Sequence, residues 1–339
     1  YELLSGELEL WEVAPKFSAL ASELGFIFLQ ECVVEVNEIE RKLITSSETV
    51  LKYSQLVIST GVTTDYSLAV GLKEYSYGFS DLNDLLRIKK LLTLINNSSK
   101  YTNPLVIVGA GPTGVELACK LSDLVNNKLE ICLVDKGNKI LSKSKSFNRE
   151  KAIDAIAMRN IKIYLEHNIE SINENIIEFS NVEADRKNSL KINYTGLLLT
   201  AGSRPFGLKL VDHLLDKNKR FKVNQFLQIN EYQNIFFIGD IVFCENYPFP
   251  SSAQSAMQQG YVTAQNIISL RKGNKLKSFQ YEDLGEMLSL GIGNASITGY
   301  GITLAGSLAF KIRHLAYLMR MPGFSLPLKS LGSRFLSKK

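Results

Sequence analysis

Three glycines and one acidic residue form the pattern in this sequence that points most directly to chemistry. Gly109, Gly111 and Gly114 have the order GxGxxG and follow the apolar run at 105–108, while Asp135 closes the next apolar run. In such a unit the first glycine allows a tight turn, the second lets the backbone approach a pyrophosphate, and the third lets helix and strand pack closely. Because the amides and dipole at the start of a helix bind phosphate, the spacing predicts a dinucleotide site.

Two acidic residues near this pattern could affect nucleotide binding: one could select NADH over NADPH, and the other could act near the nicotinamide. Asp135 can accept hydrogen bonds from ribose hydroxyls, and its charge would repel a 2′-phosphate. NADH is therefore favoured over NADPH, while Lys136 and Lys139 nearby leave NADPH open. Glu116 lies two residues after Gly114. It is either a carboxylate stabilised by the helix dipole, by ~0.3–1 kcal/mol, or a residue with a role near the nicotinamide.

The glycine pattern needs a strand, a helix and a second strand to position it, and residues 104–135 predict that βαβ unit. An amphipathic helix is expected at 80–95. A helix near 147–158 and a strand at 161–165 are expected after the unit. The run at 197–202 reads as a further buried strand that ends on the small residues Thr-Ala-Gly.

A second group of strands is expected outside this region. The segments 26–36, 41–45 and 49–52 alternate or run apolar, as in a small antiparallel meander. Residues 56–61 and 235–240 each predict a buried strand that ends on glycine. Ser251 or Ser252 can then cap a helix that runs to about residue 270.

Together these motifs resemble the two-dinucleotide-domain flavoprotein reductases, and most closely the type II NADH dehydrogenases, over nearly the whole chain. The resemblance implies an α/β fold with two Rossmann-like domains that bind FAD and NAD(P)H, the second inserted in the first. The implied parts are the first piece of the FAD domain at 1–66, the NAD(P)H domain at 67–204, the second FAD piece at 205–272 and a C-terminal membrane-associating region at 273–339.

The same resemblance implies roles for individual residues. The turn after the first FAD strand looks like the family's flavin turn, and Asp240 looks like the aspartate that hydrogen-bonds the ribityl chain. The FAD positions carried over in this way are Thr60, Gly61, Gly239, Asp240 and Ala253, and the counterpart turn of the NAD domain holds Ala201 and Gly202.

Residues 253–260 resemble the quinone-site helix of the family. Gln254 and Gln258 are four residues apart and so share a helix face. Because an amide both donates and accepts, it suits a quinone carbonyl that becomes a hydroxyl on reduction. The alternative is an ordinary polar stripe on a solvated helix.

The implied activity is hydride transfer from NAD(P)H to FAD, followed by transfer of two electrons to a membrane quinone. The opening residues 1–15 resemble the cyanobacterial and plastid branch, which includes demethylphylloquinone reductases. Two alternatives stay open. One is a soluble reductase of the same fold that acts on a disulfide, a peroxide or an electron-transfer protein, and the other is a non-catalytic NAD-binding module.

One departure from the family concerns the start of the sequence. Members begin with a strand and their own GxGxxG for FAD, and neither precedes Tyr1 in this sequence. We therefore expect that residues precede this sequence in the full protein, and that residues 1–339 alone retain flavin weakly or not at all.

Composition limits the partners. The four cysteines are scattered without CxxC spacing, which favours a reducing compartment and argues against a metal site. The net charge is +5, and residues 287–339 hold seven cations and no acids. A local basic segment favours an anionic surface over a nucleic-acid groove.

The C-terminal residues suggest where that surface lies. Apolar residues occur at near-helical spacing, with cations between them, at Leu304, Leu308, Ile312, Leu315 and Met319. No apolar run reaches 18 residues, so we expect this segment to lie on the cytoplasmic side of a membrane without crossing it. The alternatives are a helix pair that packs on the body of the protein and a contact in a homodimer.

Overall fold

The computed structural model describes residues 1–126, 128–182, 189–205, 215, 220–323 and 325–336, with side chains up to residue 330. The described chain forms two compact units. Unit 1 consists of Tyr1–Phe28, Thr64–Gly202 and Gly285–Lys339, and unit 2 consists of Leu29–Thr63 and Ser203–Leu284. Strands β5 (Val62–Thr64) and β13 (Ser203–Pro205) pair with each other where the chain passes between the units.

Unit 1 is built on a parallel sheet of four strands. The order is β12 (Gly196–Leu199), β6 (Leu105–Val108), β7 (Ile131–Val134) and β8 (Lys162–Tyr164). Every residue of β6, β7 and β12 is buried. Parallel strands that are covered on both faces read as continuous apolar runs, which is the pattern of these segments.

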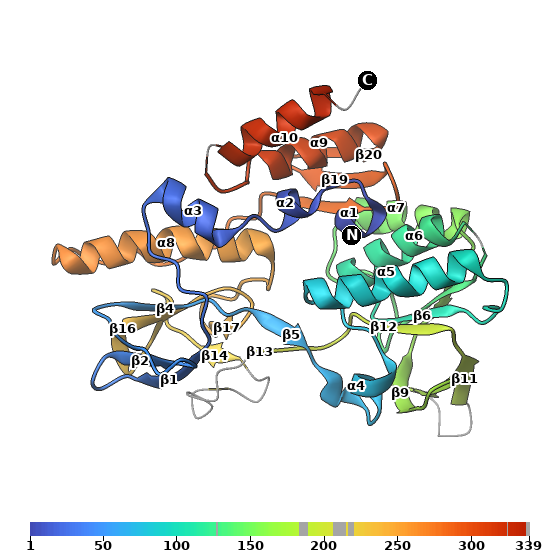
Figure 1. Ribbon diagram of the computed structural model, residues 1–339, viewed down its shortest axis with the longest axis horizontal. Helices are drawn as coiled ribbons and strands as arrows, with labels where there is room; N and C mark the ends of the chain where they lie inside the picture. The colour runs from blue at the N-terminus through green and yellow to red at the C-terminus, as the bar shows by residue number, and fades with distance from the viewer. Residues whose placement is uncertain (127, 183–188, 206–214, 216–219, 324, 337–339) are drawn as a thin grey trace. The chain divides into compact units, whose positions relative to one another are not determined.

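Alternate residues of these strands serve two cores. Leu105, Ile107 and Leu133 belong to a core shared with α5 (Leu82–Asn97), α6 (Pro112–Val125) and α7 (Ser146–Met158). Val106 and Cys132 belong to the opposite core, which includes residues of the antiparallel strands β9 (His167–Ile172), β10 (Ile176–Asn181) and β11 (Ser189–Asn193). Figure 1 shows the helices on one side of the parallel sheet and these strands on the other.

The two ends of the chain meet within unit 1. An antiparallel sheet of β18 (Glu286–Ser289), β19 (Ala295–Gly299) and β20 (Ile302–Gly306) leads into α9 (Ser307–Leu318) and α10 (Ser325–Leu336). These elements lie beside the short helices α1 (Glu2–Ser5), α2 (Leu10–Val13) and α3 (Phe17–Leu24) (Figure 1).

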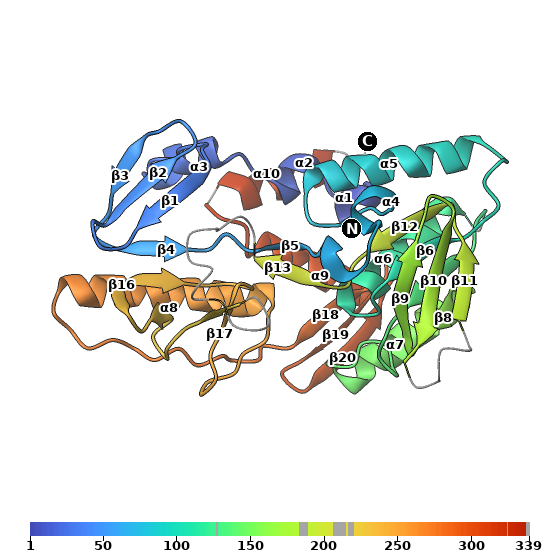
Figure 2. The same ribbon diagram turned by 90° about the horizontal axis from the view of Figure 1, so that it is seen from below.

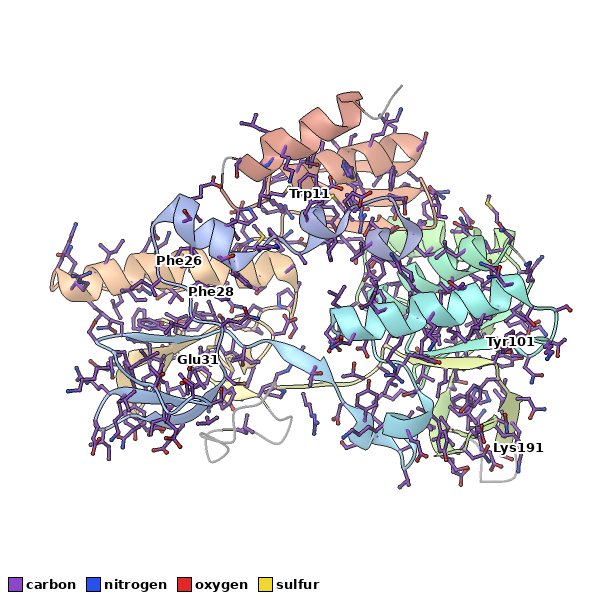
Figure 3. All side chains as sticks on the ribbon, in the orientation of Figure 1. Trp11, Phe26, Phe28, Glu31, Tyr101 and Lys191 are labelled. Carbon is purple, nitrogen blue, oxygen red and sulfur yellow. The ribbon has the colours of Figure 1, made fainter. Side chains whose placement is uncertain are left out.

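Side-chain contacts join α10 to α2 and α3. Ser330 donates a hydrogen bond to Glu12, Ser325 Oγ donates to Glu23 at 2.5 Å, and the Lys329 ammonium lies 4.5 Å from the centre of the Trp11 ring. Figure 3 marks Trp11, the single tryptophan of the chain, on the side of α2 that faces α10.

Unit 2 contains a smaller sheet in which β16 (Tyr232–Phe237) runs parallel to β4 (Leu56–Ile58) and antiparallel to β15 (Gln228–Ile229). The long helix α8 (Ala253–Arg271) lies along this sheet, as both ribbon views show (Figures 1 and 2). The unit also holds the antiparallel meander β1 (Val33–Asn37), β2 (Lys42–Thr45) and β3 (Val50–Lys52), and the short parallel pair β14 (Phe221–Lys222) and β17 (Val242–Phe243).

Most elements expected from the sequence are present, and the α/β fold with a Rossmann-like βαβ unit is confirmed. Two expectations on element boundaries were wrong. Residues 26–32 form no strand, and the first strand of the meander begins at Val33. Leu304 lies on β20 opposite Ile297, and the helix begins only at Ser307, after Gly306 with φ +89°. The bounds assigned to the FAD and NAD(P)H domains stay predictions.

Candidate functional site

In unit 1 the glycine pattern lies at the carboxyl edge of the parallel sheet. Gly109 follows β6 with φ +113°, a conformation that favours glycine. A Cβ atom there would lie 2.7 Å from Thr200 Oγ1 and 2.8 Å from the Ala201 nitrogen. Thr200 Oγ1 in turn donates to the Val108 carbonyl at 2.9 Å. The two turns predicted to bind the nucleotide, at 109 and 201, therefore lie against each other.

The other two glycines serve different purposes. A Cβ at Gly114 would lie 1.7 Å from the Gly109 carbonyl oxygen, so only glycine allows this approach of α6 to the turn. At Gly111, which caps α6, a Cβ would meet no described atom within 4 Å. A tightly packed helix start beside an open backbone position fits a dinucleotide pyrophosphate.

Asp135 is held in place by the backbone. One carboxylate oxygen accepts from the Ala110 N–H and the other from the Gly137 N–H, both at 2.6 Å. The charge is therefore fixed beside the glycine turn, while Lys136 and Lys139 are exposed. Gly202 ends the counterpart turn with φ +78°, and a Cβ there would lie 2.7 Å from Leu68 Cδ1.

In unit 2 the predicted flavin positions share one sheet edge. β4 and β16 are parallel neighbours, so the turns that follow them meet at their carboxyl ends, where the Ile238 N–H donates to the Ile58 carbonyl at 3.0 Å. The turn after β4 contains Thr60 and Gly61, and the turn after β16 contains Gly239. Gly61 has φ +68° and Gly239 has φ +85°, and a Cβ at either would meet no described atom within 4 Å.

Asp240 carries an unsatisfied atom at this edge. Its Oδ1 is buried and has no hydrogen-bond partner among the described residues. Burial raises the pKa of the Asp240 carboxyl, against the attraction of Arg220. Because a buried acceptor without a donor costs free energy, the position fits a bound group that brings a hydroxyl, as the ribityl chain of FAD would.

A third glutamine of α8, which the sequence did not single out, supports that turn. Gln259 is buried, accepts from the Gly239 N–H at 2.7 Å and donates to Ser255 Oγ at 2.9 Å. Ser252 caps the helix by accepting from the Ser255 N–H at 3.2 Å, so Ala253 is the first helical residue.

Gln254 and Gln258 reach the same neighbouring segment, residues 281–284. Gln258 donates to the Glu282 carbonyl at 2.8 Å and accepts from the Glu282 N–H at 3.0 Å. Gln254 Oε1 accepts from the Tyr281 hydroxyl at 2.6 Å and from the Leu284 N–H at 3.1 Å. Both amides thus hold the chain that follows α8, a role that neither sequence interpretation included.

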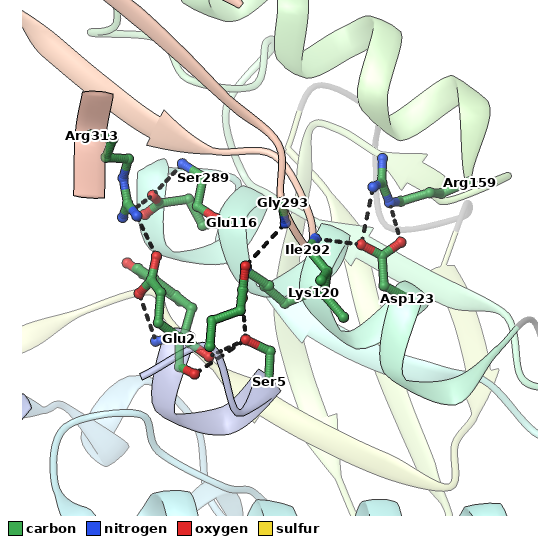
Figure 4. Close-up of polar contacts among 12 residues, drawn as sticks. Glu2, Ser5, Glu116, Lys120, Asp123, Arg159, Ser289, Ile292, Gly293 and Arg313 are labelled. Atoms are coloured by element: carbon green, nitrogen blue, oxygen red, sulfur yellow. Dashed lines mark hydrogen bonds and ion pairs between the residues drawn. The ribbon is translucent and has the colours of Figure 1, made fainter. Parts of the chain in front are cut away.

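Glu116 faces away from solvent on α6. Its Oε1 accepts from the Ser289 N–H at 2.7 Å and lies 3.5 Å from Nη2 of Arg313, which belongs to α9 (Figure 4). Burial raises the pKa of the Glu116 carboxyl to about 7, although Arg313 and the Ser289 N–H act in the opposite direction. The side chain can therefore hold or release a proton near neutral pH.

Comparison with known proteins settles the family. Residues 6–260 match the family model of the pyridine nucleotide-disulphide oxidoreductases. This chain belongs to that family. The type II NADH dehydrogenase resemblance inferred from the motifs is confirmed as well, since the similar proteins include enzymes of that kind.

Two curated relatives and one solved structure illustrate the similarity. Demethylphylloquinone reductase NdbB of Synechocystis sp. is 31% identical over 347 residues, which cover all of this chain and 84% of the relative. The type II NADH:quinone oxidoreductase of Staphylococcus aureus is 28% identical and covers 91% of this chain and 81% of the relative. The fold is similar to that of NDH2 from Plasmodium falciparum, solved in complex with NADH, with a TM-score of 0.77, 17% identity and coverage of 88% of this chain and 81% of that one.

Within this oxidoreductase, the structure groups the predicted positions by sheet edge. Gly109, Gly111, Gly114, Asp135, Ala201 and Gly202 gather in unit 1, while Thr60, Gly61, Gly239 and Asp240 gather in unit 2. Sequence reasoning missed Arg313 and Gln259. Arg313 belongs to no motif, and Gln259 lies within the glutamine segment 253–260 but was given no role, because its contact with Gly239 appears only in the fold.

The contrast between Gly114 and Gly111 gives the first prediction. We expect Gly114→Ala to lower the free energy of unfolding by about 1–3 kcal/mol, because its methyl group would overlap the Gly109 carbonyl. We expect Gly111→Ala to leave stability unchanged and to weaken NADH binding by about tenfold, roughly 1.4 kcal/mol, because its methyl group occupies the approach of the pyrophosphate. Urea unfolding and fluorescence titration with NADH measure the two effects. Equal stability of both variants would contradict the packing argument.

The second prediction distinguishes two roles for the α8 glutamines: holding residues 281–284 and contacting the quinone. Gln258→Ala removes both hydrogen bonds to Glu282 and should lower the free energy of unfolding by about 1–2 kcal/mol. Met257→Ala, at an exposed position of the same helix, is the control and should leave stability unchanged. A raised KM for the quinone in Gln258→Ala, with unfolding like that of the parent protein, would instead assign Gln258 to the substrate.

Proposed function

We propose that this protein is an FAD-dependent NAD(P)H:quinone oxidoreductase. In the overall reaction NADH, a proton and a quinone give NAD⁺ and a quinol. The observation that carries the proposal is the presence of two candidate cofactor cradles in one chain: the glycine turn at the carboxyl edge of the parallel sheet in unit 1, and the turns that follow the parallel strands β4 and β16 in unit 2. The proteins similar to it include a demethylphylloquinone reductase and type II NADH:quinone oxidoreductases.

The two cradles divide the binding of the cofactors. In unit 1, Gly109, Gly111 and Gly114 would take the pyrophosphate of NADH, and Asp135 its ribose. In unit 2, Asp240 and the turns at 61 and 239 would hold FAD, with the start of α8 at Ala253 supplying a positive helix end. When bound, the flavin accepts a hydride from the nicotinamide and passes two electrons to the quinone.

The fixed carboxylate of Asp135 supports NADH as the preferred donor. Both of its oxygens are held by backbone amides, so the charge cannot turn away from a 2′-phosphate without losing two hydrogen bonds. The exposed Lys136 and Lys139 lie nearby in sequence and keep NADPH within the proposal.

Two of the four cysteines in this sequence are unsuited to thiol–disulfide exchange. All four are free thiols. Burial raises the pKa of Cys119 and of Cys132 to about 12, which leaves both unreactive near neutral pH. Gln254 and Gln258 stay our candidates for the quinone contact, because an amide can both donate and accept there.

The third prediction tests the reaction. With FAD bound, NADH should bleach the flavin absorbance, and a short-chain quinone should restore it in stopped-flow mixing. A disulfide, hydrogen peroxide or a small iron–sulfur protein should restore it at least about tenfold more slowly. Reoxidation by one of these acceptors alone would assign the protein to the soluble reductases. NADH binding without any bleaching would point to a non-catalytic module.

We also propose that α9 and α10 lie on an anionic membrane surface on the cytoplasmic side. Large apolar side chains are exposed there at Leu308, Ile312, Leu315, Met319 and Leu328. Lys311, Arg320 and Lys329 are exposed beside them. Among the described residues, no helix has the length and apolar character needed to cross a bilayer. A homodimer contact on the same face stays a prediction.

The fourth prediction concerns this surface. Ile312→Asp should abolish sedimentation with vesicles that contain phosphatidylglycerol, because it places a charge on the apolar face of α9. Val70→Asp, at an exposed apolar position in unit 1 outside α9 and α10, is the control. Binding should weaken as salt rises, with each cation contributing roughly 1 kcal/mol at most. Equal binding of both variants, or none by the parent protein at low salt, would contradict the proposal.

A further inference from the structure

One face of α6 is charged and buried. Glu116, Lys120 and Asp123 lie four and three residues apart, so they project from the same side of the helix. Lys120 is fully buried and pairs with Glu7 of the N-terminal segment. Asp123 forms a two-point ion pair with Arg159, at 2.7 and 3.1 Å.

This face meets the C-terminal strand pair. Three backbone N–H groups at the end of β18 and in its connection to β19 donate to carboxylates. Ser289 donates to Glu116 at 2.7 Å, Ile292 to Asp123 at 2.7 Å and Gly293 to Glu7 at 3.0 Å (Figure 4). The C-terminal segment is therefore tied to the helix that begins at the nucleotide turn.

Arg313 adds a charged contact from α9. Its side chain is 3% exposed, pairs with both Glu2 and Glu116, and lies over the Tyr317 ring at 4.6 Å. Its Nε has no hydrogen-bond partner among the described residues. A buried guanidinium stays charged, so it demands compensation from the acids around it.

The two carboxyls beside Arg313 differ in how easily they ionise. The pKa of Glu2 is lowered, because the attraction of Arg313 and other favourable contacts outweigh the cost of burial. The pKa of Glu116 is instead raised by burial, which dominates over the same guanidinium. Glu2 thus balances Arg313, and Glu116 is the member that keeps a proton up to neutral pH.

Other groups surround Glu116 and contribute to its titration. They come from the elements packed against it: the Tyr1 hydroxyl and the Glu2 carboxylate from the N-terminal segment, the Ser289 N–H from β18, Arg313 and Tyr317 from α9, and Cys119 and Lys120 from α6 itself. Of these, Arg313 is the cation in the shortest contact with the Glu116 carboxylate.

We infer that Arg313 is a positioning residue for the proposed reaction: from α9 its guanidinium, 3.5 Å from the Glu116 carboxylate, holds that carboxylate against the β18 backbone. Through this contact, a residue of the C-terminal helix α9 acts on the charge of Glu116, which lies on α6, the helix that begins at the glycine turn. The inference rests on the proposed function in one respect: which reaction the Glu116 charge serves. The contacts themselves lie within unit 1 and do not depend on that function.

The fifth prediction follows the proton on Glu116 directly. The infrared carbonyl signal that Glu116→Gln removes should titrate with a midpoint of about 7 in the parent protein. Arg313→Met removes the attraction that favours the ionised form, so the midpoint should move higher. Arg313→Lys keeps a charge without the planar fork and should move it less. Lys311→Met, at an exposed position on the same helix, is the control and should not move it.

A stability measurement covers the case in which Arg313→Met does not fold. Because the pKa of Glu116 is raised above its value of 4.5 in an unfolded chain, its protonation stabilises the fold at low pH. That contribution is lost as the pH rises through about 7. The parent protein should therefore lose stability relative to Glu116→Gln between pH 4.5 and 7.

These outcomes separate the inference from the proposed function. An unmoved midpoint in Arg313→Met or an equal shift in Lys311→Met would overturn the role of Arg313. Parallel stability curves for the parent protein and Glu116→Gln would overturn the titration of Glu116 on which that role depends. Neither readout needs flavin or quinone. A protein that reduces quinone with an unmoved midpoint would refute the inference alone, whereas a moved midpoint without quinone reduction would refute the proposed function alone.

Discussion

Helix α6 has to meet two constraints at once, and the rest of unit 1 is arranged around them. Its first turn approaches the Gly109 carbonyl so closely that a side chain at Gly114 would overlap it. One turn further on, its buried face carries charges that each need a partner, because an unpaired buried charge costs several kcal/mol. The close approach leaves the first backbone amides of the helix open to a phosphate. The charged side chains bind the segments that cover the helix and so hold them in place.

The partners of those charges come from both ends of the chain. Glu7 and Glu2 belong to the N-terminal segment, while Arg313 and the amides of β18 and its connection to β19 belong to the C-terminal one. The C-terminal elements thus form a wall of unit 1 as well as a surface with exposed apolar residues. α9 takes part in both, since Arg313 lies on its inner side and Ile312 and Leu315 are exposed.

The two aspartates at the sheet edges differ in a way that suits two cofactors. Asp135 is satisfied by backbone amides, so its position does not depend on a ligand. Asp240 has an oxygen without a partner among the described residues, so a bound hydroxyl would complete its hydrogen bonds. The first arrangement suits a nucleotide that binds and leaves during turnover, and the second suits a flavin that is retained.

The sequence by itself determined the local features: the βαβ unit with Gly109, Gly111, Gly114 and Asp135, the capped helix α8 and most strands. Each depends on residues close together in the chain, where turn geometry, capping and apolar periodicity act. Tertiary structure alone decided what Glu116, Gln254 and Gln258 contact, and it alone identified Arg313 and Gln259. Their long-range contacts are made with residues 20 to 311 positions away. No spacing rule encodes such contacts, because burial and charge compensation exist only once distant segments have come together.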